Sequence, residues 1–201
     1  MIFALVTGIL TSCLQTLHAI YTPRDLVYKK ELLGKWKIEN SEANETAEFS
    51  PLASAASVDL PGKISTIKEK GYLVTYKDKY GEITEQYIAF LASIGNHFYF
   101  DFYPVPGKEE ESLDDFYRIH FTGMHIPYRV NMQKSGGFEL GQLDKGYLEK
   151  LIEQKKIRIS HEKDSDGNIR VTASTQELQQ YILKYGDNPE AVENDKIIFT
   201  R

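Results

Sequence analysis

Residues 33–39 read Leu33-Gly34-Lys35-Trp36-Lys37-Ile38-Glu39, and apolar and charged side chains alternate along them. Such alternation is typical of a strand with one buried face. Similar short stretches follow along the chain, and we expect further strands at 46–51, 63–68, 72–77, 83–92, 97–103, 116–121, 124–132, 137–143, 157–162 and 169–173. Because these stretches are short and are separated by Gly, Asp and Asn turns, they favour an antiparallel barrel or a sandwich.

Three segments show helix signals instead of strand alternation. Asp144 can cap one helix, and Ser174 with Glu177 forms a capping box at the start of another. An earlier helix is expected because Pro23 stands at a first-turn position. The expected helices cover residues 23–33, 144–154 and 174–185. The two later helices each have one apolar stripe, so they are expected to pack it against the sheet.

A short helix that leads into Gly34-Lys35-Trp36 on a first strand resembles the opening motif of the lipocalins and lipocalin-like barrels. The resemblance implies that Gly34 and Trp36 close one end of a barrel, and that an arginine from a late strand stacks on the tryptophan. Arg158 and Arg170 are the candidates for this arginine. The second motif of the family, a Thr-Asp-Tyr-type triplet, is absent. We expect a mainly β domain over residues 34–201, an antiparallel lipocalin-like β-barrel with two short amphipathic helices packed outside.

The first 23 of the 201 residues contain no Lys, Arg, Asp or Glu. The apolar run before Cys13 is shorter than the roughly 20 residues that span a bilayer, and it has the length of a signal-peptide core, about 7 to 15 residues. The four residues Leu10-Thr11-Ser12-Cys13 resemble the lipobox of bacterial lipoproteins, which implies a lipid anchor on Cys13. Residues 1–19 are therefore expected to be a signal and anchor segment, and residues 20–33 a tether that includes the first helix.

Other interpretations of this uncharged head stay open. It could act as a secretion signal or a simple membrane tether, or it could be an apolar helix buried in a soluble protein. Cleavage after Ala19 is less favoured because Leu17 is large where a small residue is preferred. No acidic run follows Cys13, which favours the periplasmic side of a cell-envelope membrane.

The alternation within residues 97–132 predicts a register. If Thr122 and Gly123 form a tight turn and Tyr103 pairs with Phe116, apolar residues face one another across three strands. Residues 116–121 are then the central strand of this patch. The opposite face is polar and aromatic and bears Tyr99, Asp101, Tyr103, Arg118, His120, His125 and Arg129. A slip of one residue would put apolar side chains against polar ones, so this register is favoured.

Two arrangements of this patch are open. Either the apolar face fills the barrel and the polar face is partly solvated, or helices cover the apolar face and the polar face lines a cavity. The second arrangement predicts a ligand site formed by Tyr99, Asp101, Arg118, His120 and His125. Two histidines with Asp101 or His97 could ligate a metal, but rings hydrogen-bonded to tyrosines are favoured, and no metal is expected. Asp101 and Arg118 favour a structural ion pair over a substrate clamp.

Composition excludes several classes of function. The net charge is −5 and no Lys/Arg run occurs, which argues against nucleic-acid binding. A single cysteine allows no internal disulfide and no thiolate-rich metal site. No phosphate loop, nucleophile elbow or zinc-protease helix is present, and no cofactor is expected. The stretch 164–168 has oxygen ligands at alternating positions, but it favours a hairpin turn over a calcium loop because the EF-hand pattern is incomplete.

The sequence therefore favours a lipid-anchored, periplasm-facing binding module of lipocalin-like type for a small molecule. The alternative is a non-enzymatic interaction or assembly subunit with a filled barrel that docks a membrane-associated protein. An unrecognised hydrolase built from Asp101 and His120 is less favoured than either. The size of the cavity separates the first two, because ligand sites usually enclose about 300 Å³ or more.

Overall fold

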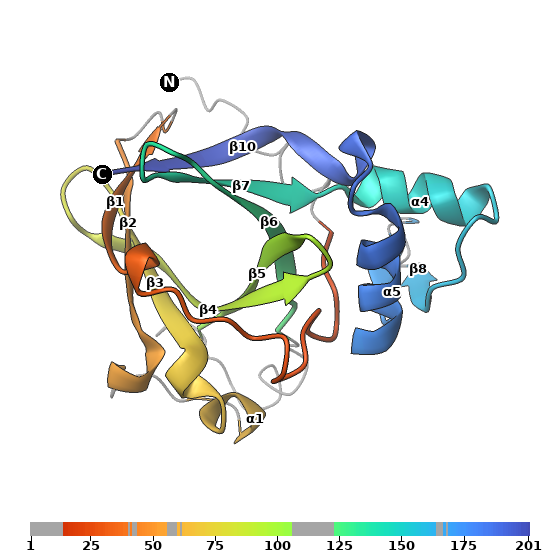
Figure 1. Ribbon diagram of the computed structural model, residues 1–201, viewed down its shortest axis with the longest axis horizontal. Coiled ribbons are helices and arrows are strands. Elements are labelled where there is room, and N and C mark those ends of the chain that lie inside the picture. Colours follow the sequence, from red (N-terminus) through yellow and green to blue (C-terminus); the bar gives the residue numbers. More distant parts are fainter. Residues whose placement is uncertain are drawn as a thin grey trace.

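The computed structural model describes residues 14–39, 41, 44–55, 60, 62–105, 123–163, 167 and 169–201. Eight of the described strands form a closed antiparallel barrel in the order β1-β10-β7-β6-β5-β4-β3-β2 (Figure 1). They are β1 (Gly34–Glu39), β2 (Thr46–Pro51), β3 (Gly71–Lys77), β4 (Ile83–Ile94), β5 (His97–Pro104), β6 (Ile126–Met132), β7 (Phe138–Leu143) and β10 (Val192–Thr200). The predicted fold class, a mainly β chain with a lipocalin-like antiparallel barrel, is confirmed.

The connection between β7 and β10 forms a layer on one outer side of the barrel (Figure 1). It contains α4 (Lys145–Glu153), the hairpin of β8 (His161–Lys163) and β9 (Ile169–Val171), and α5 (Thr175–Tyr185). The expected caps are present, since the Asp144 side chain accepts the Tyr147 N–H and Ser174 forms a capping box with Glu177. Shorter turns of helix are α1 (Gly62–Ser65), η1 (Lys30–Leu32), η2 (Leu52–Ser54), η3 (Lys68–Lys70) and η4 (Pro189–Ala191).

Three strand predictions differ from the structure. Residues 63–68 belong to α1 and η3, where Ser65 and Thr66 hydroxyls donate to backbone carbonyls and so favour turns over a ladder. The predicted strands 157–162 and 169–173 are limited to the short hairpin of β8 and β9. Strand β10 was not predicted, because the polar run Glu193–Lys196 hides its alternation, and the ladder to β7 is irregular there.

Residues 14–33, here called the N-terminal strap, lie along the outside of the barrel. Thr16 bridges to His125 and Val171, and Leu26 bridges to Ala92. The predicted helix over 23–33 is wrong: only residues 30–32 form a helical turn, because the backbone of Asp25 and Val27 bonds to β4 instead. The segment 20–33, predicted to be a tether, lies against the barrel with its apolar residues buried, namely Ile20, Tyr21, Leu26 and Leu32.

The predicted register of the central patch is wrong as well. Strand β5 pairs directly with β6, with Tyr99 opposite Arg129 and Phe100 opposite Tyr128, and its other neighbour is β4. Residues 116–121, expected between them, lie outside the described residues. The alternation could not separate the two registers, because Tyr128 offers Phe100 an apolar partner just as the predicted Ile119 would.

The inner face of β5 is apolar and fills the barrel. It belongs to a buried cluster formed by Leu32, Trp36, Ala47, Phe49, Tyr72, Val74, Ala89, Leu91, Phe100, Phe102, Val130, Phe138, Leu140 and Phe199. On the outer face, Tyr99 is 0% and Asp101 1% exposed beneath the strap and the helical layer, while Tyr103, His125 and Arg129 are half-buried. For the described residues the first predicted arrangement is therefore confirmed, because the apolar face fills the barrel and the polar face is only partly solvated. The second arrangement is wrong for both faces.

Candidate functional site

One end of the barrel is closed by Trp36, whose ring packs edge-on against Phe138 at 4.9 Å between centroids. Its Nε1 donates to the Leu32 carbonyl at 2.8 Å. The Arg201 guanidinium lies 4.5 Å from the centre of the tryptophan ring, and its Nη2 donates to the Glu31 carbonyl at 2.8 Å. The stacked arginine is therefore Arg201, so the prediction of Arg158 or Arg170 is wrong. Gly34 adopts a φ of +114°, which a residue with a side chain rarely adopts.

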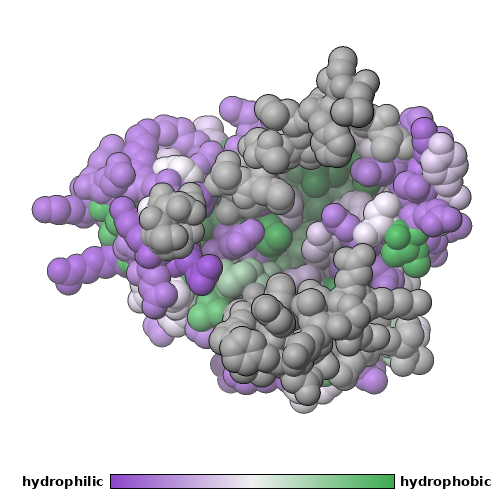
Figure 2. Space-filling model, turned by 180° about the vertical axis from the view of Figure 1, so that it is seen from behind, coloured by the Kyte–Doolittle hydropathy of each residue, from purple (hydrophilic) through white to green (hydrophobic). Residues whose placement is uncertain are grey.

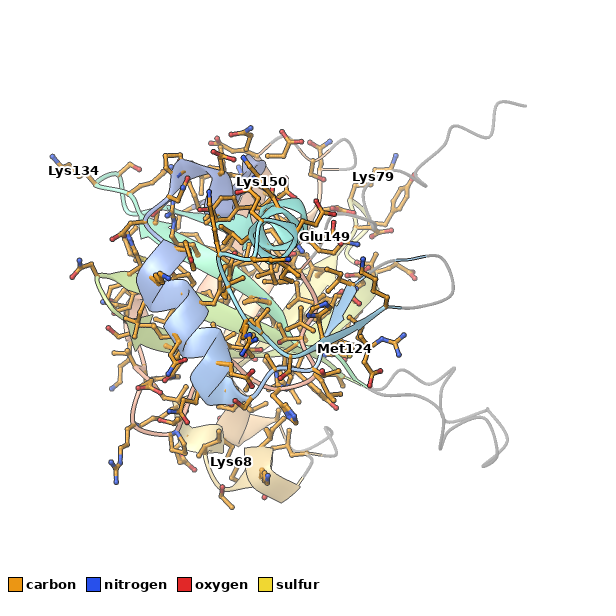
Figure 3. The ribbon with its side chains drawn as sticks, turned by 90° about the vertical axis from the view of Figure 1, so that its right-hand side faces the viewer. Lys68, Lys79, Met124, Lys134, Glu149 and Lys150 are labelled. Atoms are coloured by element: carbon orange, nitrogen blue, oxygen red, sulfur yellow. The ribbon has the colours of Figure 1, made fainter. Side chains whose placement is uncertain are left out.

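The opposite end of the barrel is open. Antiparallel order places Glu39, Lys77, Pro104 and Ile126 at this end, which we call the mouth. In Figure 3, Lys79 next to β3 and Lys134 next to β6 lie on opposite sides of the molecule, at the mouth and at the closed end respectively. Figure 2 views the molecule from behind Figure 1 and shows this side hollowed, with hydrophobic side chains in the hollow.

A pocket of about 260 Å³ occupies the mouth. We call it the mouth pocket, and it is lined by Glu45, Tyr76, Thr84, Glu85, Tyr87, Phe102, Ile126, Tyr128 and Ile197. The lining residues come from β2 or its approach, β3, β4, β5, β6 and β10, so the pocket is enclosed by almost the whole circumference of the barrel.

Aromatic rings form much of the wall of this pocket. Tyr76 and Tyr87 are 6.0 Å apart at 88°, Tyr87 and Phe102 5.9 Å apart at 87°, and Phe102 and Tyr128 5.4 Å apart at 80°. These edge-to-face contacts are a favoured geometry for aromatic pairs. Because successive rings stand nearly perpendicular, each ring restricts the movement of the next.

Two carboxylates share the pocket with these rings. The Tyr87 hydroxyl donates to Glu85 Oε2 at 2.6 Å, and the Ser41 hydroxyl donates to Glu45 Oε2 at 3.2 Å. Burial raises the pKa of Tyr76, and the neighbouring tyrosines and the Glu85 and Glu45 carboxylates raise it further. Glu45 and Glu85 are the charged side chains of the described lining, which includes no lysine, arginine or histidine.

The predicted ligand-site residues Tyr99, Asp101 and His125 lie elsewhere, on the outer face under the strap. Asp101 accepts the Ile20 N–H at 2.9 Å and contacts His125 Nδ1 at 2.7 Å. The backbones of Thr16 and His125 exchange two hydrogen bonds of 2.9 Å. These groups fasten the strap to the barrel. Arg118 and His120, the other two predicted residues, lie outside the described residues.

Tyr99 stands next to α5 and shows how tightly this outer face is covered. Burial raises its pKa to about 12. Arg129, opposite Tyr99 on β6, donates from Nη1 to the Gly186 carbonyl at the end of α5. Within the described residues, the hydroxyls of Tyr99 and Tyr181 have no hydrogen-bond partner. The outer polar face is therefore an interface between the barrel and its helical layer.

Two wider depressions lie on the helical layer. One of about 730 Å³ runs beside α4 and β8, and one of about 420 Å³ lies between α4 and η4. Both are shallow, and one charged group in each already has a partner: Glu177 accepts from Ser160, and Lys150 pairs with Glu190. The mouth pocket is the better candidate site because rigid strands enclose it.

Several expectations concern metals and membranes. In the part of the chain that the structure describes, no three His, Cys, Asp or Glu side chains are grouped as metal ligands, and no helix has the length and apolar character to cross a bilayer. Cys13 lies outside the described residues. So does most of the stretch 164–168, of which only Gly167 is described, with a φ of +83° between the paired strands β8 and β9.

Comparisons with protein-family models, with curated proteins and with solved structures find no match to this chain. A barrel of this kind can support unrelated functions, so function has to be argued from the geometry of the site. The mouth pocket was missed at the sequence level because its residues are ordinary tyrosines and glutamates. The available signal was position: each lies at an inward-facing place near the same end of its strand.

Proposed function

We propose that the protein is a lipid-anchored, periplasm-facing binding module that holds a small molecule in the mouth of its barrel. The observation that carries the proposal is the pocket of about 260 Å³ at the open end of a barrel whose other end is closed by Trp36 and Arg201. Ligand pockets usually measure about 300 to 1,000 Å³, so the occupant is small or enters only in part.

The lipocalin-like assignment of the chain is part of this proposal. Its support is the combination of Gly34 and Trp36 on the first strand with Arg201, after the last strand, stacked on the indole. Through this stack, Arg201 covers Trp36 at the closed end of the barrel.

The position of the strap supports an anchor on Cys13. Leu14 and Thr16 are 1% and 0% exposed, so the chain is already packed at the residue after the cysteine. Cleavage before Cys13 would leave this packing intact, whereas cleavage after Ala19 would remove the bridges of Thr16 to His125 and Val171. Since His125 directly precedes β6, the strap begins at the mouth. An anchor on Cys13 would therefore hold the mouth towards the membrane.

Native mass spectrometry of the protein extracted from its own membrane tests the pocket. We expect a small-molecule adduct on the natural chain and its loss in Ile126→Trp, which fills the mouth pocket. Met132→Trp is the matched control, because Met132 is 41% exposed near the other end of the same strand. Absence of any adduct, with unchanged behaviour of Ile126→Trp, would reject the binding module.

Partitioning between detergent and water tests the anchor. Cys13→Ala should move the protein to the aqueous phase, while Ser12→Ala, which keeps the thiol and a small residue before it, should stay with the detergent. If Cys13→Ala also stays with the detergent, residues 1–23 themselves bind the membrane, and the proposed lipid anchor is wrong.

A second candidate function, an interaction subunit that docks a membrane-associated protein, is favoured by one observation. Tyr80 is 79% and Ile83 58% exposed on the β3–β4 hairpin beside the mouth. A double variant, Tyr80→Ser with Ile83→Ser, separates the two functions. It should keep the small-molecule adduct of a binding module, but it should release a partner that copurifies with an interaction subunit.

A further inference from the structure

We propose that the mouth pocket recognises an ammonium group, carried by a free small amine or by the amine headgroup of a phospholipid. This inference rests on the proposed function, because it names the chemistry of the ligand that the pocket holds. Three features of the pocket carry it: its aromatic walls, its carboxylates and its size.

The aromatic walls suit a cation. The face of an aromatic ring attracts a cation that lies within about 6 Å of its centre, and several rings at right angles can surround a substituted ammonium group. Tyr76, Tyr87, Phe102 and Tyr128 form such a set, with successive rings at 80° to 88°. The edge-to-face contacts fix the rings before a ligand arrives, so little freedom is lost on binding.

The carboxylates add a charge that no described basic side chain compensates. Within the described residues, the partners of Glu45 and Glu85 are neutral hydroxyls, Ser41 and Tyr87, and neither carboxylate forms an ion pair. Glu48 offers the contrast, since it lies close by on β2 and pairs with Lys77 at 2.9 Å. A half-enclosed site with two unpaired carboxylates favours a cation and disfavours an anion such as a fatty acid.

The size and placement of the pocket fit an ammonium group. A volume of about 260 Å³ is small for a whole lipid or a drug-sized molecule, but it admits a substituted ammonium group with a short chain. The pocket opens at the end where the strap begins, so a headgroup and a dissolved amine could both reach it.

The first arm of the test uses choline and its neutral carbon isostere, in which a tert-butyl group replaces the trimethylammonium group. Isothermal titration of the full chain carrying Cys13→Ala should show choline binding at least tenfold tighter than the isostere. The double variant Glu45→Gln with Glu85→Gln should weaken choline binding at least tenfold. Glu48→Gln removes a nearby carboxylate outside the pocket and is the matched control. Equal affinity for both compounds would overturn the inference.

The second arm separates the two sources of the ammonium group. Vesicles of digalactosyldiacylglycerol, a neutral lipid without an ammonium group, are compared with vesicles containing one half phosphatidylcholine. Greater cosedimentation with the latter, lost in the glutamine double variant but kept in Glu48→Gln, identifies the lipid headgroup. Choline binding without this preference identifies a free amine. If choline does not bind and the vesicles show no preference, the inference is overturned. If the copurifying adduct persists in that case, the pocket binds another chemistry and the proposed function stands.

Discussion

The two ends of the barrel are built from the same strands but from different side chains. At the closed end, Phe138 and Phe199 stack at 4.5 Å and 7°, and Trp36 packs edge-on against Phe138; all three are 0% or 1% exposed. At the mouth, the inward positions carry tyrosines and carboxylates around open space. The packing of the closed end stabilises the fold, whereas the tyrosines and carboxylates of the mouth line a pocket that a ligand could enter. Stability and recognition are therefore separated along the barrel axis.

The largest expected effect tests the closed end. Trp36→Ala removes a fully buried indole, its hydrogen bond to the Leu32 carbonyl and the surface on which Arg201 stacks. Such truncations cost about 3 to 5 kcal/mol of unfolding free energy. Chemical denaturation followed by circular dichroism measures it. A loss below about 1 kcal/mol would mean that this end is not a packed core, and the contrast between the ends would fail.

The next effect concerns the strap, which runs from the mouth to the closed end. Asp101→Ala leaves the buried Ile20 N–H and the His125 ring without their acceptor. An unsatisfied buried group costs about 1 to 3 kcal/mol, so we expect that loss of stability together with faster amide exchange at Ile20. Asp195→Ala, at an exposed position of β10, is the control and should change neither. Unchanged exchange at Ile20 would show that Asp101 does not hold the strap.

Much of the fold could be predicted from the sequence because period-two alternation reports burial on one face. It located the strands from β1 to β7, and the capping residues located α4 and α5. It failed where pairing partners had to be chosen, since residues 116–121 and β6 offer Phe100 similar neighbours. It failed again for the strap, whose backbone hydrogen bonds are made to distant parts of the chain and leave no local pattern.

The candidate site was harder to predict for a related reason. The sequence draws attention to histidines and to buried charge, and Asp101 and His125 are indeed brought together, but as a fastening for the strap. The mouth pocket depends on which end of each strand faces the opening, which follows only from the closed topology. Tyr76 and Tyr128 look the same in sequence as Tyr72, which is buried deeper in the barrel.

A smaller effect on stability is expected in the helical layer, away from both ends of the barrel. Backbone and hydroxyl donors of Ser174, and then Ser160, lower the pKa of Glu177 to about 2. Since the unfolded value is about 4.3, this carboxylate stabilises the fold above that pH, and the contribution is lost as the pH falls towards 2. Glu177→Gln should therefore lower stability at neutral pH and flatten its decline between pH 4 and 2. Denaturation at several pH values measures this, with Glu162→Gln on exposed β8 as control.

The smallest expected effect on stability is at the mouth, where, in contrast to the variants above, no loss is expected. Glu45→Gln with Glu85→Gln removes two like charges that share one pocket. Because no ion pair is lost among the described residues, we expect stability to be unchanged or to rise by no more than about 0.5 kcal/mol. The pKa of Tyr76 should fall only slightly, because burial is the main cause that raises it and the two carboxylates only add to that effect. Ultraviolet titration of the tyrosines and denaturation of the same variant measure the two effects. A clear loss of stability would mean that these carboxylates serve the fold, and the mouth would then differ from the closed end in composition but not in role.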